Sequence, residues 1–160
     1  MNVKKNYKAY LNMISTKKML ALFCANIFFI VLDRILKNIA SGLDPVHVSD
    51  AFFSFAFVKN YNIAFSIPIG GPFLNLAIIA IVLLLLYQAF ELYRKDKSRE
   101  FFFLLLVVFG AISNLYDRLQ FGYVIDYLSV RHFTVFNAAD AMIVIGVLFF
   151  IVFSGERKSK

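Results

Sequence analysis

Four long apolar runs constrain this chain more than any other feature of its sequence. Each is close to the roughly 17 to 25 helical residues that cross a hydrocarbon core about 30 Å thick. The chain is 61% hydrophobic and 17% charged, whereas a typical soluble protein has about 45 to 50% apolar residues. We therefore predict an all-α integral membrane protein, a single membrane domain over residues 1–160, with four transmembrane helices. The expected spans are about 19–40, 73–93, 101–119 and 138–153.

The basic residues give the expected orientation. Lys and Arg near short loops are retained on the cytoplasmic side of a membrane. Twelve of the seventeen Lys and Arg residues precede the first run, separate the second run from the third, or follow the fourth. Both termini are therefore predicted to be cytoplasmic, with residues 41–72 and 120–137 outside. Most of the acidic residues lie at or beyond the outer ends of the runs, so chemistry is expected at the outer membrane surface.

Other classes of partner and cofactor are disfavoured. The net charge of +7 could suit nucleic acid, but the basic residues form short clusters beside apolar runs and not one soluble face. Cys24 is the only cysteine, so an internal disulfide is excluded. His47 and His132 stand far from other ligand types, so no metal site is predicted.

The first apolar run has a competing interpretation as a cleavable signal peptide, because lysines precede it and small residues follow it at 40–42. Three charged residues, Asp33, Arg34 and Lys37, lie between the apolar run and those small residues. They argue against cleavage there, and the run is kept as a span.

Asp33 lies deep in the first predicted helix. At 1.5 Å per residue it is about 21 Å from the inner end, in the outer third of the bilayer. Lys37 follows on the same helical face. Either the two form an ion pair that snorkels toward the headgroups, or Asp33 faces an interior polar site, because an ionisable group at that depth is otherwise costly.

The third predicted helix ends in a polar group. Asn114, Asp117 and Arg118 share one face at spacings of three and four, so they can hydrogen-bond one another. The group is either a polar helix end, with Arg118 reaching headgroup phosphate, or part of a site.

Two further carboxyls, Asp126 and Asp140, flank the start of the fourth predicted helix. Asn137 and Asp140 have the spacing of a helix cap, and the helix N-terminus favours an ionised Asp140. Asp126, among apolar residues, would more readily stay protonated if buried. Capping alone could explain Asn137 and Asp140, but two carboxyls with opposite preferences are also what acid/base hydrolysis of an amide requires.

The first outer segment contains one pattern typical of a strand. Phe53, Phe55 and Phe57 alternate with smaller residues, and the turn-prone residues 60–62 follow them. We expect a small extracytoplasmic β element between the first and second helices, lying on the membrane and shielding a substrate from water.

These motifs together resemble lipoprotein signal peptidase, the signal peptidase II family of membrane aspartic proteases. The resemblance covers nearly the whole chain, although it departs from the family pattern at Leu36, Asn62, Ile63 and Ser113. It is carried by Asp33 with Lys37 and by residues 58–66, 110–118, 121–127 and 136–140.

The resemblance implies a bacterial cytoplasmic-membrane enzyme that cleaves signal peptides from lipid-modified prolipoproteins, just before the modified cysteine, on the extracytoplasmic side. It implies no metal or organic cofactor, and its partners would be prolipoproteins and membrane lipids. Asp126 and Asp140 would be the catalytic pair. The implied supporting residues are Asp33, Lys37, Asn60, Asn114, Asp117, Arg118 and Asn137.

Two alternatives remain at this stage. A relative that binds prolipoproteins without cleaving them is motivated by the altered outer-loop motif at Asn62 and Ile63. A small cation transporter could use the outer carboxylates as ligands, although no polar stripe continues through the second and fourth runs.

Overall fold

The structure, a computed structural model, describes residues 3–43, 52–61, 71–131 and 134–155, with side chains described from residue 16 onward. It contains four helices that are long and apolar enough to cross a membrane, which confirms the predicted number of spans. The elements in chain order are α1 (Val3–Ser41), β1 (Phe53–Asn60), α2 (Pro72–Arg94), α3 (Ser98–Phe121), β2 (Val124–Val130), β3 (Thr134–Phe136) and α4 (Ala138–Gly155).

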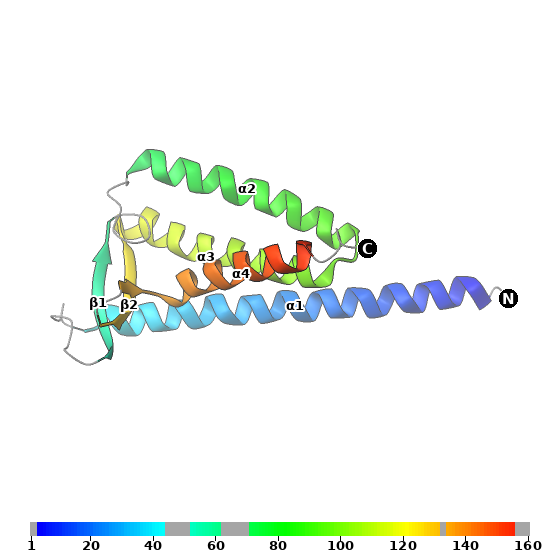
Figure 1. The fold of residues 1–160 in the computed structure, drawn as a ribbon, viewed down its shortest axis with the longest axis horizontal. Coiled ribbons are helices and arrows are strands. Elements are labelled where there is room, and N and C mark those ends of the chain that lie inside the picture. Colours follow the sequence, from blue (N-terminus) through cyan, green and yellow to red (C-terminus); the bar gives the residue numbers. More distant parts are fainter. Residues whose placement is uncertain (1–2, 44–51, 62–70, 132–133, 156–160) are drawn as a thin grey trace.

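The helices run along one another, and the strands lie together at one end of the bundle, which we call the sheet end (Figure 1). The start of α1, the end of α4 and the turn from α2 to α3 lie at the opposite end (Figure 1). Helix α1 is longer than predicted, because its 39 residues begin at Val3 and not near residue 19. At 1.5 Å per residue it is about 58 Å long, and it extends beyond the other helices (Figure 1).

The sheet differs from the prediction, because it is not confined to the segment between α1 and α2. Its three strands have the order β1-β2-β3, and both pairs are antiparallel. Strands β2 and β3 were missed. Residues 124–127 at the start of β2 are all buried, so this strand lacks the alternation of apolar and polar residues by which a half-exposed strand is found in a sequence.

The register of the sheet brings Asn60 of β1 near Asp126 of β2. Val58 pairs with Asp126, and Asn60 pairs with Val124, so the end of β1 lies beside the first part of β2. Gly122 ends α3 in a left-handed conformation with φ 81°, which glycine adopts readily. The chain then turns directly into β2.

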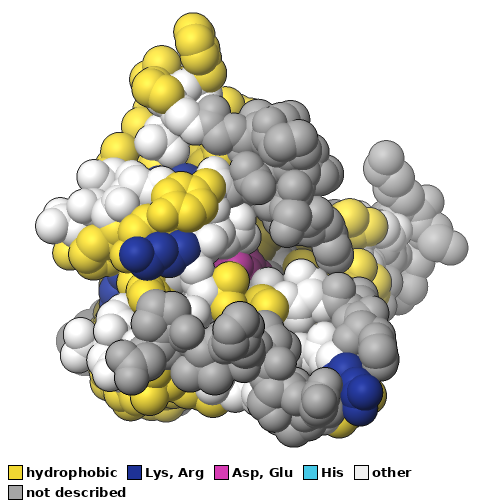
Figure 2. All heavy atoms as spheres, turned by 90° about the vertical axis from the view of Figure 1, so that its left-hand side faces the viewer, with side chains coloured by type: hydrophobic (Ala, Val, Ile, Leu, Met, Phe, Trp, Pro, Cys, Tyr) yellow, Lys and Arg dark blue, Asp and Glu magenta, His cyan; other side chains and the backbone are white. Residues whose placement is uncertain are grey.

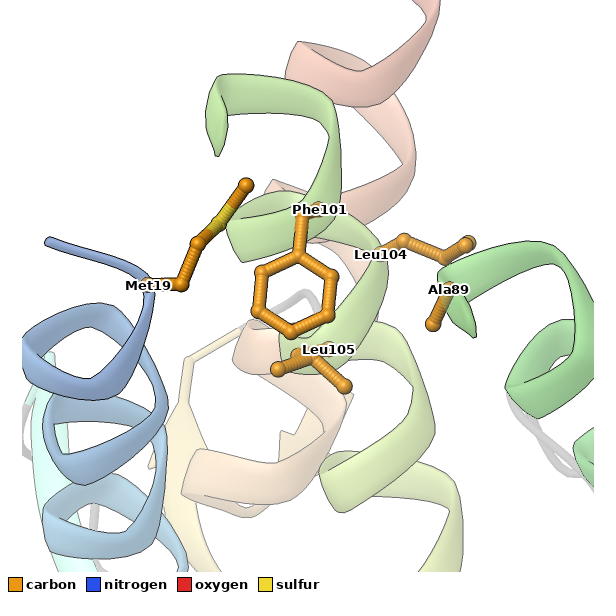
Figure 3. Close-up of a cluster of buried hydrophobic side chains, with 5 residues drawn as sticks. All are labelled: Met19, Ala89, Phe101, Leu104 and Leu105. Atoms are coloured by element: carbon orange, nitrogen blue, oxygen red, sulfur yellow. The ribbon is translucent and has the colours of Figure 1, made fainter. Parts of the chain in front are cut away.

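Helix α3 is the centre of the bundle. It contacts each of the other three helices. Of the residues in its most apolar stretch 61% are buried, against 11 to 17% in the corresponding stretches of the other helices. Figure 3 shows Met19 of α1 and Ala89 of α2 packed around Phe101, Leu104 and Leu105 of α3. The outward faces of the other helices therefore carry the apolar surface that lipid would cover.

One stripe of α1 faces the bundle. Its described buried residues recur at helical spacing, and three of the five are polar. They are Met19, Asn26, Asp33, Lys37 and Ala40.

Two glycines allow α3 and α4 to approach closely. A Cβ atom on Gly110 would lie 2.5 Å from the backbone oxygen of Ala139. A Cβ atom on Gly146 would lie 2.7 Å from the backbone oxygen of Phe103. Small residues at such crossings let helix backbones pack in a membrane, so these two positions hold α4 against the centre of the bundle.

We predict that Gly146→Ala lowers the free energy of unfolding by about 1 to 3 kcal/mol, the usual effect of overpacking, because its Cβ meets backbone atoms that cannot rotate away. Gly155→Ala is the matched control, since a Cβ there has no atom within 4 Å. Thermal unfolding in detergent measures both variants. Equal unfolding midpoints would contradict the close packing.

Candidate active site

Asp33 and Lys37 face the interior of the protein. Their side chains are 0% and 1% exposed, and the Lys37 Nζ atom lies 3.2 Å from Asp33 Oδ2. The interpretation as a pair that snorkels to the headgroups is therefore wrong. The alternative, an interior polar site, agrees with the structure.

Asp33 and Lys37 belong to a cluster of four charges that joins α1 to α3. Arg34 Nη1 lies 2.7 Å from Asp117 Oδ1, and Lys37 Nζ lies 2.7 Å from Asp117 Oδ2. Arg34 also lies 3.3 Å from Asp33. The Asp117 carboxylate accepts a further hydrogen bond of 3.2 Å from the backbone N–H of Ile125 in β2. Two carboxylates thus face two cations, which is the condition for burying such charges at tolerable cost.

The Asp33 carboxylate also binds three other parts of the chain. Ser113 Oγ of α3 donates to Oδ2 at 2.5 Å. The Tyr127 hydroxyl of β2 and the backbone N–H of Ala139 in α4 donate to Oδ1 at 3.1 and 3.2 Å. One buried carboxylate therefore connects α1 with α3, the sheet and the start of α4.

Asp126 and Asp140 lie on either side of Asn137. Asn137 Nδ2 donates to Asp126 Oδ1 at 2.7 Å, and its backbone N–H donates to Asp140 Oδ2 at 3.2 Å. Asn60 Nδ2 holds the other Asp126 oxygen at 2.9 Å, and Asn114 Nδ2 holds Asp140 Oδ1 at 2.7 Å. The Asp140 N–H donates back to Asn137 Oδ1 at 2.9 Å, which confirms the predicted cap of α4.

Asn114 connects the carboxyl pair to the charge cluster. Its Oδ1 accepts hydrogen bonds from Lys37 Nζ at 2.8 Å and from Asn137 Nδ2 at 3.2 Å. Asn114 of α3 thus makes contacts to α1 and to residues at the start of α4. Arg118 is half-buried and lies within electrostatic range of both carboxyls. The structure thus brings together every residue that the sequence proposed for the site.

Burial decides the protonation of Asp126. Its side chain is 1% exposed, and this desolvation, followed by the nearby Asp140 carboxylate, raises the pKa of Asp126 to about 7. The hydrogen bonds from Asn60 and Asn137 act in the opposite direction. Seen from the sheet end, acidic side-chain atoms are visible in a hollow of the surface (Figure 2). The site can therefore hold a proton near neutral pH.

Sequence reasoning did not assign Arg34, Ser113 and Tyr127 to the site. A charged residue next to Asp33 inside an apolar run was a usable signal for Arg34. The hydroxyls of Ser113 and Tyr127 gave no such signal, because these residues occur in ordinary cores and only the fold places them beside Asp33.

Among the described residues, no group of three His, Cys, Asp or Glu side chains could hold a metal ion. Cys24 is exposed on α1. His47 and His132 lie outside the described residues.

A family model described as "Signal peptidase (SPase) II" matches residues 25–155, which contain the whole site. The chain belongs to this family. A lipoprotein signal peptidase of Clostridium novyi is 31% identical over 137 residues, covering 79% of this chain and 92% of that protein. One of Pseudoalteromonas translucida is 43% identical over 115 residues, covering 65% of this chain and 69% of the relative.

The fold is also found among solved structures. A bacterial membrane enzyme superposes with a TM-score of 0.72 at 22% sequence identity, covering 87% of this chain and 90% of that one. Together with the four apolar helices, this similarity supports a multi-pass membrane protein.

We predict that Lys37→Met lowers the free energy of unfolding by about 3 to 5 kcal/mol, the cost of leaving a buried charge unpaired. Lys37 is 1% exposed and lies close to both Asp33 and Asp117. Lys95→Met is the control, because its ion pair with Glu91 is largely exposed and such pairs contribute little. Unfolding in mixed detergent measures both. A Lys37 variant as stable as the Lys95 variant would contradict the role of the cluster.

Proposed function

We propose that this protein is an aspartic endopeptidase that cleaves signal peptides from lipid-modified prolipoproteins, with Asp126 and Asp140 as its catalytic pair. The observation that carries the proposal is the hydrogen-bonded unit in which Asn137 contacts both carboxyls. Membership of the signal peptidase II family supports it, and so do relatives named lipoprotein signal peptidases.

In the proposed reaction one carboxyl is ionised and the other is protonated. The carboxylate removes a proton from a water molecule, whose oxygen attacks the carbonyl carbon of the scissile amide. The protonated carboxyl donates its proton to the carbonyl oxygen, which gives a neutral tetrahedral diol. As the diol collapses, one of its hydroxyls returns a proton to the carboxylate that had protonated the carbonyl oxygen, the C–N bond breaks, and the carboxyl that took its proton from water donates that proton to the leaving amine. No covalent intermediate with the protein forms, and the pair returns to its starting state with one shared proton.

The supporting residues would hold the pair in a dry and rigid setting. Asn60 and Asn114 each fix one oxygen of a catalytic carboxyl. Lys37 reaches Asn114 from the charge cluster, so the position of this amide depends on the buried ion pairs. Such preorganised polar groups assist a reaction because they need no rearrangement as charge develops.

The membrane would deliver the substrate. Acyl chains and an apolar signal helix anchor a prolipoprotein in the bilayer, so its cleavage site would arrive near the surface where the pair lies. Basic residues such as Arg94 and Lys95 lie at the turn between α2 and α3, away from the sheet end (Figure 1). By the positive-inside rule, the sheet end would be extracytoplasmic in the bacterial cytoplasmic membrane.

The alternatives are not favoured. A cation transporter would need a polar path across the bundle, but only two residues of α2, Val82 and Ala89, are buried, and both are apolar. The altered residues Asn62 and Ile63, which motivate the alternative of a relative that binds without cleaving, lie outside the described residues. Within the described residues, both carboxyls of the pair accept hydrogen bonds from asparagine side chains.

We predict that Asp126→Asn and Asp140→Asn each abolish cleavage, with a loss of at least about a thousandfold, the order expected when a group needed for proton transfer is removed. The measurement is a gel shift of a diacylated model prolipoprotein incubated with purified protein in detergent. Asp96→Asn, in the turn between α2 and α3, is the control and should cleave normally. Wild-type rates in either variant of the pair would refute the assignment.

The pH dependence should follow the raised pKa of Asp126. Its ordinary value is 3.8 and its value in the protein is about 7, so the proton that the pair needs is lost as the pH rises through about 7. The rate of cleavage should therefore decline as the pH rises through about 7. Asn60→Leu removes a hydrogen-bond donor that favours the ionised form of Asp126, so in this variant the decline should occur at higher pH. Asn75→Leu in α2 is the control. If the cleavage rate of the Asn60 variant declined at the same pH as that of the wild type, this account would be contradicted.

A further inference from the structure

The hydroxyl of Tyr127 makes two hydrogen bonds that the proposed chemistry does not use. Its side chain is fully buried. Tyr127 directly follows Asp126 in the chain. The hydroxyl donates to Asp33 Oδ1 at 3.1 Å and accepts from the backbone N–H of Ala138 at 3.0 Å. A phenol has one hydrogen to donate and lone pairs that accept, so this one group satisfies both partners.

The second of these bonds belongs to the N-terminus of α4. The first N–H groups of a helix have no partner within the helix. Here the N–H of Ala138 binds Tyr127, that of Ala139 binds Asp33, and that of Asp140 binds Asn137. Three partners from outside the helix body therefore hold its first turn, and Asp140 is the third residue of that turn.

We propose that Tyr127 is a positioning residue, whose hydroxyl fixes the first turn of α4 to Asp33 and thereby places Asp140 against Asp126. The inference rests on the proposed function. Tyr127 and Asp126 are neighbours on β2. This short strand therefore carries both Asp126 and the hydroxyl that holds the start of α4, the helix to which Asp140 belongs. In the described contacts the hydroxyl bonds Asp33 and Ala138, so it acts through them and not on the substrate.

Two observations support a specific role for the hydroxyl. First, burial and the nearby Asp33 carboxylate raise the pKa of Tyr127, so the phenol keeps the hydrogen that it donates. Second, Ser113 holds the opposite oxygen of the Asp33 carboxylate at 2.5 Å. The carboxylate is thus held from both sides, and a movement of either partner would be passed to α4 through Ala139.

The test is Tyr127→Phe, which removes only the hydroxyl and keeps the ring that packs against Phe55 at a centroid distance of 5.4 Å. Tyr87→Phe is the matched control, because Tyr87 lies on α2 and is 64% exposed. Cleavage of a diacylated model prolipoprotein is measured in detergent over a range of substrate concentrations, at a temperature where both variants are folded, so that kcat and KM are obtained separately.

We expect kcat of the Tyr127 variant to fall about tenfold, which corresponds to about 1.4 kcal/mol, while KM stays within about twofold. That division is the mark of a misplaced catalytic group and not of lost substrate binding. The Tyr87 variant should match the wild type. An unchanged kcat, a change in KM alone, or a loss of kcat that only follows the folded fraction would overturn the inference.

If the Tyr127 variant does not accumulate, Ser113→Ala tests the same inference, because Ser113 donates to the other oxygen of the Asp33 carboxylate. It should lower kcat with little change in KM, and a wild-type kcat would overturn the inference. The two proposals fail in different ways. An inactive wild type, or an active Asp126→Asn variant, would remove the proposed function itself, whereas normal turnover by the Tyr127 variant would leave that function intact.

Discussion

The structure depends on a cluster of four charged groups, three of them buried and Arg34 partly exposed, in a bundle whose outer surface is apolar. Asp33, Asp117, Arg34 and Lys37 form ion pairs of 2.7 to 3.3 Å. A buried charge pair is a weak source of stability, because desolvation consumes most of the Coulombic gain. Its value here is geometric. The Asp33 carboxylate also accepts hydrogen bonds from the sheet and from α4, and the Asp117 carboxylate accepts one from the sheet, so the helices and the sheet have one relative position in which all partners are satisfied.

Asparagine side chains carry this order from the charge cluster to the carboxyl pair. An amide offers a donor and an acceptor on one short side chain, so it can link two groups without adding charge. Asn114 accepts from Lys37 and donates to Asp140, and Asn137 donates to Asp126 while capping the helix that carries Asp140. A Lys or Asp in either place would change the net charge around Asp126 and therefore its pKa.

Sequence reasoning reached the helices and the polar residues that lie together at the sheet end, but not the contacts between those residues. The apolar runs predicted the four spans because a membrane imposes a length and an apolar composition, and polar residues within those runs were visible as exceptions. Strand β2 was missed because the buried residues 124–127 show no alternation, and strand β3 because it has only three residues. The partners of Asp33 could not be predicted, since Ser113 and Tyr127 are 80 and 94 residues away in the chain, and no local pattern specifies such contacts.

The same burial that orders the site also raises the pKa of one of its carboxyls. Asp126 lies on a strand whose neighbouring residues are closed to solvent, and removal from water raises the pKa of its carboxyl to about 7. A more exposed Asp126 would ionise at its ordinary pKa near 3.8, and the pair would then lack the proton on this carboxyl at neutral pH. The sheet is therefore more than a cover over the bundle. By placing Asp126 in a closed strand beside the polar start of α4, it brings a carboxyl that can keep its proton next to Asp140, whose two oxygens already accept hydrogen bonds.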